Sequence, residues 1–167
     1  MERWRKVDEA APDEAREMLR VCCGADSWVD RMMERRPFGS SAAVLAAARE
    51  EWFRLPPESW IEAFGHHPRI GDRDAMRVKF APTRTLSARE QSGVSNVSDE
   101  VLNALLEGNR LYEERFGFIF IVCAIGKSAE EMLRLLDARM NNDRSAELRV
   151  AAGEHAKICE LRLMGDV

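Results

Sequence analysis

Two adjacent histidines, His66 and His67, stand directly before Pro68 near the middle of the chain. Proline disfavours the helical conformation for the residue before it, so we expect His67 in extended or turn geometry just past a helix. The ordinary pKa of an imidazole lies close to neutrality, which lets the ring give or take a proton in a reaction. A solvated loop that ends a helix explains the same residues, and the local sequence alone favours that interpretation.

Three other stretches each contain groups that need a partner. Ser87 and Glu90 have the spacing of a capping box, which predicts a helix start, although a glutamate could also share acid and base chemistry with a histidine. Arg162 falls on an apolar helical stripe, where its guanidinium must reach solvent or meet a carboxylate of the protein or of a ligand. The apolar run over residues 118–124 has strand propensity but no strand partner, so it either is helical or crosses the core in extended form with its amides bonded elsewhere.

The sequence lacks the motifs of several common chemistries. It has no H-E-x-x-H pattern and no cysteine and histidine set with zinc spacing, so we predict no metal site. It also lacks the glycine-rich motifs that bind nucleotides and the Gly-x-Ser-x-Gly motif of serine hydrolases. The remaining candidate constellation consists of His67, Glu90 and Arg162, together with the backbone of residues 118–124.

The elements that must position these residues are helices. Helical spacing of apolar residues predicts helices over residues 12–23, 27–36, 41–53, 57–64, 98–116, 128–140 and 145–164, besides the helix start at Ser87. We therefore predict an all-α fold with about eight helices and no substantial sheet. A length of 167 residues suits a single domain over residues 1–167.

Particular residues define the expected ends of these helices. Gly24 suits the position that follows the first helix, and Gly117 suits the end of the helix over residues 98–116. Ser27 is expected to cap the second helix, and Pro57 fits the first turn of the fourth. Ser128 begins a second sequence with capping-box spacing.

Composition argues against nucleic-acid and membrane partners. Lys and Arg number 25 and Asp and Glu number 29, and the two signs are interspersed, so there is no basic patch for a nucleic acid. No apolar run approaches the roughly 18 residues that a membrane span needs. The four cysteines form no C-x-x-C pair. We expect them to be buried thiols in a reducing compartment, and we expect a cytoplasmic protein.

Four segments in the expected order resemble the OHCU decarboxylase family. They are His-Pro-Arg-Ile-Gly at 67–71, Ser-Ala-Arg-Glu-Gln-Ser-Gly at 87–93, residues 109–121, and Leu-Arg-Leu at 161–163. A further similarity at residues 28–38 extends the resemblance over nearly the whole chain. OHCU is 2-oxo-4-hydroxy-4-carboxy-5-ureidoimidazoline, an intermediate of urate breakdown. The resemblance implies an all-helical carboxy-lyase that converts OHCU to (S)-allantoin without a metal or organic cofactor, and it suggests a homodimer.

The same resemblance assigns site residues. It makes His67 the essential histidine and Glu90 the essential glutamate. The substrate-binding positions that it implies are Pro68, Ser87, Gln91, Phe120, Ile121, Val122 and Arg162. The chain departs from the family pattern at His66, where relatives carry a small residue, and the register before Pro68 favours His67 as the active histidine.

The expected chemistry needs few groups. Loss of carbon dioxide leaves an electron pair on a ring carbon, and the imine of the substrate can delocalise it without a cofactor. We expect His67 to donate the proton, Glu90 with Ser87 and Gln91 to hold the ring and the ureido group, and Arg162 to pair with a substrate oxygen. Two alternatives stay open. One is a helical binding module with a decayed site, and the other is a hydrolase or racemase of a related ureido or hydantoin compound.

Overall fold

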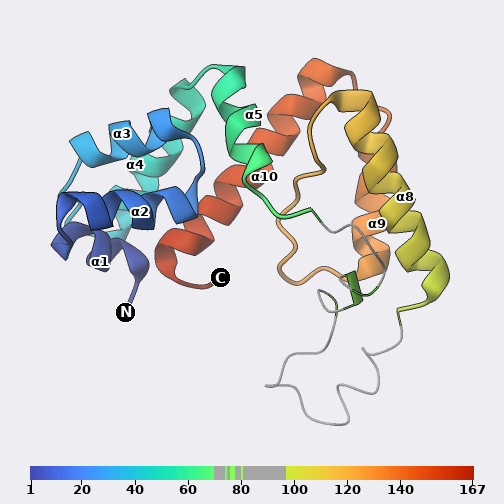
Figure 1. The fold of residues 1–167 in the computed structure, drawn as a ribbon, viewed down its shortest axis with the longest axis horizontal. Coiled ribbons are helices and arrows are strands. Elements are labelled where there is room, and N and C mark those ends of the chain that lie inside the picture. Colours follow the sequence, from blue (N-terminus) through green and yellow to red (C-terminus); the bar gives the residue numbers. More distant parts are fainter. Residues whose placement is uncertain (70–73, 75, 78–79, 81–96) are drawn as a thin grey trace, which may run out of the picture. The chain divides into compact units, whose positions relative to one another are not determined.

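The computed structural model of the protein describes residues 1–69, 74, 76–77, 80 and 97–167. These residues form eight α-helices joined by turns and irregular segments, and no strand occurs among them (Figure 1). The predicted all-α class is confirmed. None of the helices in this described part is long and apolar enough to cross a membrane. The chain divides into two compact units, and the single domain over residues 1–167 stays a prediction.

The first unit comprises residues 1–67, 121–123 and 148–167. Its N-terminal helices are α1 (Arg3–Glu9), α2 (Pro12–Cys22), α3 (Asp26–Glu34), α4 (Ser41–Arg54) and α5 (Pro57–Gly65), and α10 (Arg144–Met164) joins it from Leu148 onward. Helix α2 packs against α1 and α3, and α3 packs against α4 (Figure 1). The indole of Trp52 in α4 donates a hydrogen bond of 2.9 Å to the carbonyl oxygen of Ala152 in α10. This bond fixes α4 on the C-terminal helix.

Two helix starts in this unit differ from the prediction. Helix α1 has no strong sequence signal, because its seven residues bury only Trp4 and Val7 and so show no clear period. Helix α3 begins at Asp26 after Ala25, so the predicted cap at Ser27 is wrong. The hydroxyl of Ser27 lies 3.2 Å from that of Ser59 in α5 and links two helices instead.

Gly24 follows the end of α2 as predicted, but the structure gives a second reason for the glycine. Its φ is not positive, so the left-handed helix stop that glycine often supplies is not used. A Cβ atom added to Gly24 would lie 2.4 Å from Cγ and 2.6 Å from Cβ of His66. Only glycine lets the chain after α2 approach the end of α5 this closely.

We expect Gly24→Ala to lower the free energy of unfolding by about 1–3 kcal/mol, the usual cost of forcing extra atoms into a packed site. Adding His66→Gly removes the three side-chain atoms that the new methyl group would meet, and it should recover part of that loss. Gly153→Ala is the matched control, because nothing lies within 4 Å of its added Cβ. Urea unfolding measures all four proteins. Equal stability of the Gly24→Ala and Gly153→Ala proteins would contradict the steric explanation.

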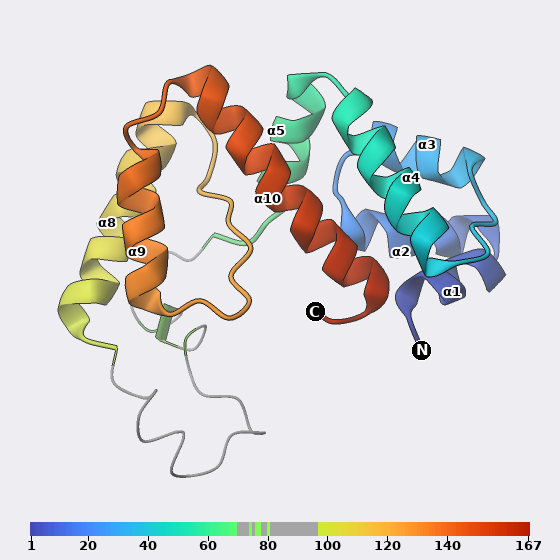
Figure 2. The same ribbon diagram turned by 180° about the vertical axis from the view of Figure 1, so that it is seen from behind.

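The second unit comprises residues 68–120 and 124–147. Its long helices are α8 (Asp99–Phe116) and α9 (Ala129–Arg139), which pack against each other (Figures 1 and 2). A Cβ atom added to Gly108 in α8 would lie 2.9 Å from Cδ2 of Leu136 in α9. The small residue therefore allows the leucine to pack directly onto the α8 backbone.

Helix boundaries in this unit follow the predicted capping chemistry. The side chain of Ser98 accepts a hydrogen bond from the N–H of Val101 at the start of α8. Gly117 ends α8 with a φ of 82°, in the left-handed region. Ser128 and Glu131 form a complete capping box at the start of α9. Each of these ends depends on contacts within a few residues, which is why the local sequence predicts them.

A buried charged cluster joins three segments of the second unit. Glu147, in the first turn of α10, is fully buried, and its Oε1 accepts a hydrogen bond of 2.6 Å from Nε of Arg139. The same oxygen accepts a bond from the hydroxyl of Tyr112, and Nδ2 of Asn142 donates to Oε2 at 2.9 Å. Burial, and next the bond to Glu147, raise the pKa of Tyr112, so its phenol remains a donor. The guanidinium carbon of Arg139 also lies 4.6 Å from the ring centroid of Phe120.

Candidate active site

The two adjacent histidines lie in different environments. Helix α5 ends at Gly65, and the exposed His66 caps it and approaches Gly24. The N–H of His67 donates to the carbonyl oxygen of Phe64 at 3.1 Å, which sets the backbone just past the helix. The half-buried ring of His67 meets the ring of His155 at a centroid distance of 5.1 Å and an angle of 84°. The structure therefore directs His67, and not His66, towards the aromatic interior of the first unit.

His155 is a buried imidazole on α10, only 1% exposed. It stacks on Trp52 at 4.4 Å and 21° and lies 5.8 Å from the ring of Phe64. Its Nε2 is buried and has no hydrogen-bond partner among the described residues. Burial lowers the pKa of His155 to about 3, and electrostatic interaction with His67 and Arg162 lowers it further. His155 is therefore neutral throughout the pH range in which an ordinary histidine titrates.

The buried neutral state of His155 predicts a loss of stability in acid. Because its pKa is about 3 in the folded protein and 6.5 without the protein environment, the unfolded chain binds the extra proton between these two values. The free energy of unfolding should thus fall as the pH is lowered through this window, by an amount on the order of a few kcal/mol. Urea unfolding at steps from pH 7 to pH 4 measures it. His155→Phe should lose less than the wild type, and parallel losses would contradict the prediction.

Arg162 has a third kind of partner that the two sequence-based alternatives did not include. Its Nη1 donates to the carbonyl oxygens of Val21 and Cys22 at 3.2 and 3.3 Å. These carbonyls belong to the last turn of α2, where a helix lacks internal donors and carries a partial negative charge. No carboxylate of the described residues pairs with Arg162, and a carboxylate of a ligand stays a prediction. The guanidinium is anchored through one nitrogen, and Nε and Nη2 make no hydrogen bond to the other described residues.

The apolar run over residues 118–124 is neither helix nor strand. The helical one of the two predicted alternatives is therefore wrong, and the extended crossing stays a prediction. Phe120 belongs to the second unit, where its ring lies 5.2 Å from that of Tyr112. Residues 121–123 belong to the first unit, and the N–H of Cys123 donates to the Glu154 carboxylate in α10 at 3.3 Å. The Glu154 side chain thus accepts a hydrogen bond from a backbone amide that, in a sheet, would bond to a neighbouring strand.

The predicted site residues are distributed over both units. Three of them, Ser87, Glu90 and Gln91, lie outside the described residues. Pro68 is exposed and belongs to the second unit with Phe120. The first unit contains His67, Ile121, Val122 and Arg162. Within it, His67 and Arg162 both lie near enough to His155 to act on its charge.

Sequence reasoning missed the aromatic cluster that His67 contacts. His155 meets the ring of His67, and Trp52 and Phe64 pack on His155. A signal for His155 was present, because it precedes Arg162 by seven residues on the same apolar helical face, and a titratable group on such a face needs an explanation. Trp52 and Phe64 had no comparable signal, since apolar spacing explains them as core residues.

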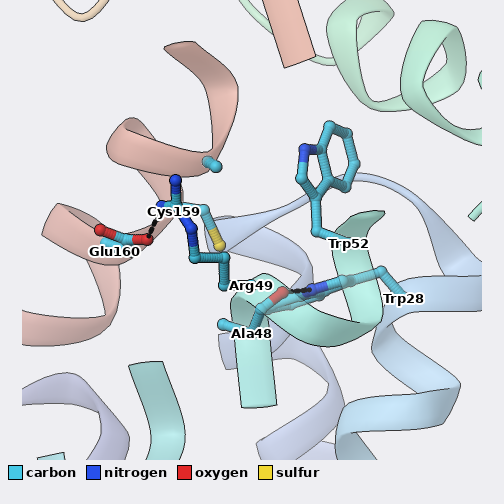
Figure 3. Close-up of a pocket in the computed structure, with 7 residues that line it drawn as sticks. Trp28, Ala48, Arg49, Trp52, Cys159 and Glu160 are labelled. Carbon is cyan, nitrogen blue, oxygen red and sulfur yellow. Dashed lines mark hydrogen bonds and ion pairs between the residues drawn. The ribbon is translucent and has the colours of Figure 1, made fainter. Parts of the chain in front are cut away.

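A small hollow in the first unit contains none of the predicted site residues (Figure 3). Its lining residues come from α3, α4 and α10, and they are Trp28, Ala48, Arg49, Trp52, Ala156, Cys159 and Glu160. Nη1 of Arg49 lies 2.8 Å from Oε1 of Glu160, and both residues of this ion pair line the hollow (Figure 3). Within the described parts of the chain, no three potential metal-ligating side chains gather at one point. The candidate active site is built around His67, whose ring meets the buried cluster of His155, Trp52 and Phe64.

A sequence profile of the family described as OHCU decarboxylase matches this chain over residues 8–164. The chain belongs to the OHCU decarboxylase family. It is 37% identical over 145 residues to the uric acid degradation bifunctional protein of Arabidopsis thaliana, which corresponds to 86% of this chain and 44% of that protein. It is 31% identical over 128 residues to the 2-oxo-4-hydroxy-4-carboxy-5-ureidoimidazoline decarboxylase of Amia calva, or 77% of this chain and 73% of the relative.

Solved structures show the same relationship. A crystal structure of an OHCU decarboxylase in the presence of (S)-allantoin matches with a TM-score of 0.69 and 35% identity, over 86% of this chain and 92% of the other. A crystal structure of (S)-allantoin synthase matches with a TM-score of 0.71, over 98% of this chain and 54% of the other. The second pair shares only 15% identity, so it shows a common fold alone. The helical fold of the OHCU decarboxylase family therefore extends over most of the chain.

Proposed function

We propose that this chain is a carboxy-lyase that decarboxylates OHCU to (S)-allantoin in urate breakdown, without a cofactor. The observation that carries this proposal is the match over residues 8–164 to the OHCU decarboxylase family. The structural relative crystallised in the presence of (S)-allantoin supports the choice of product. Relatives of the bifunctional type are much longer than this chain, so the proposal concerns the decarboxylation step alone.

His67 is the proton donor in this proposal. Cleavage of the bond between the ring carbon and the carboxylate releases carbon dioxide and leaves an electron pair, which the imine of the substrate delocalises. A proton must then reach that carbon from one face to give a single enantiomer. The half-buried ring of His67 lies at the edge of the aromatic cluster of Trp52, Phe64 and His155, which supports its role as an oriented donor.

The other proposed site residues bind the substrate. Glu90 with Ser87 and Gln91 would hold the ring and the ureido group, and Pro68 and the backbone of residues 120–122 would line the site. Arg162 would pair with an anionic or carbonyl oxygen of the substrate. Its anchor on the carbonyls of α2 supports this role, because a guanidinium fixed through Nη1 offers Nε and Nη2 as a rigid pair of donors.

Isotope release tests the reaction class. OHCU that carries ¹³C in its carboxyl group should yield labelled carbon dioxide faster with the protein than without it. A hydrolase or racemase of a related ureido or hydantoin compound would leave that label in the product. A binding module with a decayed site would bind allantoin, measured by calorimetry, without accelerating label release. Either of these results would contradict the proposal.

We further propose a homodimeric, cytoplasmic protein folded as one domain. The family resemblance supports the homodimer, and the four free, buried cysteines suit a reducing compartment. Sedimentation equilibrium of the purified protein tests the first point. A single species with the 19.0 kDa mass of one chain would contradict the dimer.

A further inference from the structure

We propose that His155 is a positioning residue that holds the ring of His67 in the orientation needed for proton transfer. This inference rests on the proposed function, because it assigns His67 the role of proton donor. His155 is distinct from the site residues that family resemblance implies. The argument uses contacts within the first unit alone.

The geometry fixes His155 more firmly than His67. His155 is 1% exposed and stacks on Trp52 with an angle of 21° between the rings. The indole of Trp52 is itself fixed by its hydrogen bond to Ala152, one turn earlier on α10. The ring of Phe64 packs on His155 at 5.8 Å. His155 therefore has little freedom to rotate, and it forms a rigid surface on α10.

The ring of His67 contacts the ring of His155 on this surface. The two imidazoles meet at 84°, an edge-to-face arrangement with a centroid distance of 5.1 Å. Aromatic rings at this distance favour such an angle over a parallel stack. His67 stands past the end of α5, where the backbone alone does not fix a side chain. Contact with the rigid ring of His155 therefore restricts the rotation of the His67 ring.

The rate of proton transfer from His67 depends on the orientation of its ring. A catalytic group that is misplaced by about 1 Å can lose on the order of a hundredfold in rate, although substrate binding is unchanged. Loss of the His155 ring should therefore lower kcat and leave KM nearly constant. A purely structural role would instead lower the folded fraction and leave kcat per folded molecule unchanged.

Three variants separate these roles. His155→Ala removes the ring, whereas His155→Phe keeps a flat ring against Trp52 and removes the nitrogens. Met32→Ala is the matched control, since Met32 is a fully buried side chain of α3 in the same unit and lies outside the candidate site. Two quantities are measured on each folded protein. The first is the split between kcat and KM for OHCU, and the second is the ¹³C relaxation order parameter of the His67 ring.

We expect His155→Ala to lower kcat by about ten- to a hundredfold, to change KM by less than about threefold, and to lower the order parameter of the His67 ring. His155→Phe should restore both quantities to near wild-type values, and Met32→Ala should change neither. Unchanged kcat and ring order in His155→Ala would overturn the proposal, as would a failure of the phenylalanine to restore them. If the wild type does not act on OHCU, the proposed function fails, and the ring order alone decides whether His155 positions His67.

Discussion

A His67→Asn protein should convert OHCU to (S)-allantoin with a kcat lower by about a hundred- to ten-thousandfold, the usual contribution of a general acid. Asparagine keeps a polar side chain of similar reach but cannot donate a proton near neutral pH. The ring contact with His155 would be lost as well, although the fold of the first unit has many other contacts. Initial rates of allantoin formation, corrected for the spontaneous reaction, measure the effect.

His66→Ala provides the control for this prediction. His66 is exposed, stands one residue earlier and faces Gly24 rather than the aromatic cluster. Its substitution should change kcat by less than about threefold. A large loss in His66→Ala together with a normal rate in His67→Asn would show that the other imidazole is the donor.

Glu147→Gln should be the most destabilising of the single substitutions considered, with a loss of about 3–5 kcal/mol in the free energy of unfolding. The fully buried carboxylate accepts bonds from Arg139, Tyr112 and Asn142. Glutamine removes the negative charge that faces the guanidinium of Arg139, which is only 8% exposed. Urea unfolding followed by circular dichroism measures the loss.

Glu107→Gln is the matched control for the buried pair. Glu107 also pairs with an arginine, Arg110, at 2.7 Å, but both side chains are more than half exposed. Water screens an exposed ion pair, so this substitution should have little effect on stability. Similar losses for Glu107→Gln and Glu147→Gln would contradict the view that the buried cluster stabilises the second unit.

Features that depend on neighbouring residues could be predicted from the sequence. The helix end at Gly117 and the capping box at Ser128 are examples, because each is decided by hydrogen bonds within one turn. The cap expected at Ser27 failed because contact with Ser59, far away in sequence, competes with local capping. Position 24 also depends on a residue distant in sequence, because the close packing of His66 leaves room only for glycine there.

In the candidate site, too, features set by neighbouring residues could be predicted, and contacts with residues distant in sequence could not. The position of His67 past a helix follows from Pro68, and the interior direction of Arg162 follows from helical spacing. The partners of these residues could not be predicted. The carbonyls at the end of α2 and the ring of His155 are distant in sequence, and backbone acceptors carry no side-chain signal. Motif resemblance, rather than spacing, therefore had to supply the assignment of roles.

The decisive measurement follows optical activity while urate is oxidised to OHCU in situ at near-neutral pH, with and without the protein. We expect circular dichroism to show faster formation of (S)-allantoin when the protein is present, and His67→Asn to remove this acceleration. A slow, racemic course that the protein leaves unchanged would contradict the proposed decarboxylase activity.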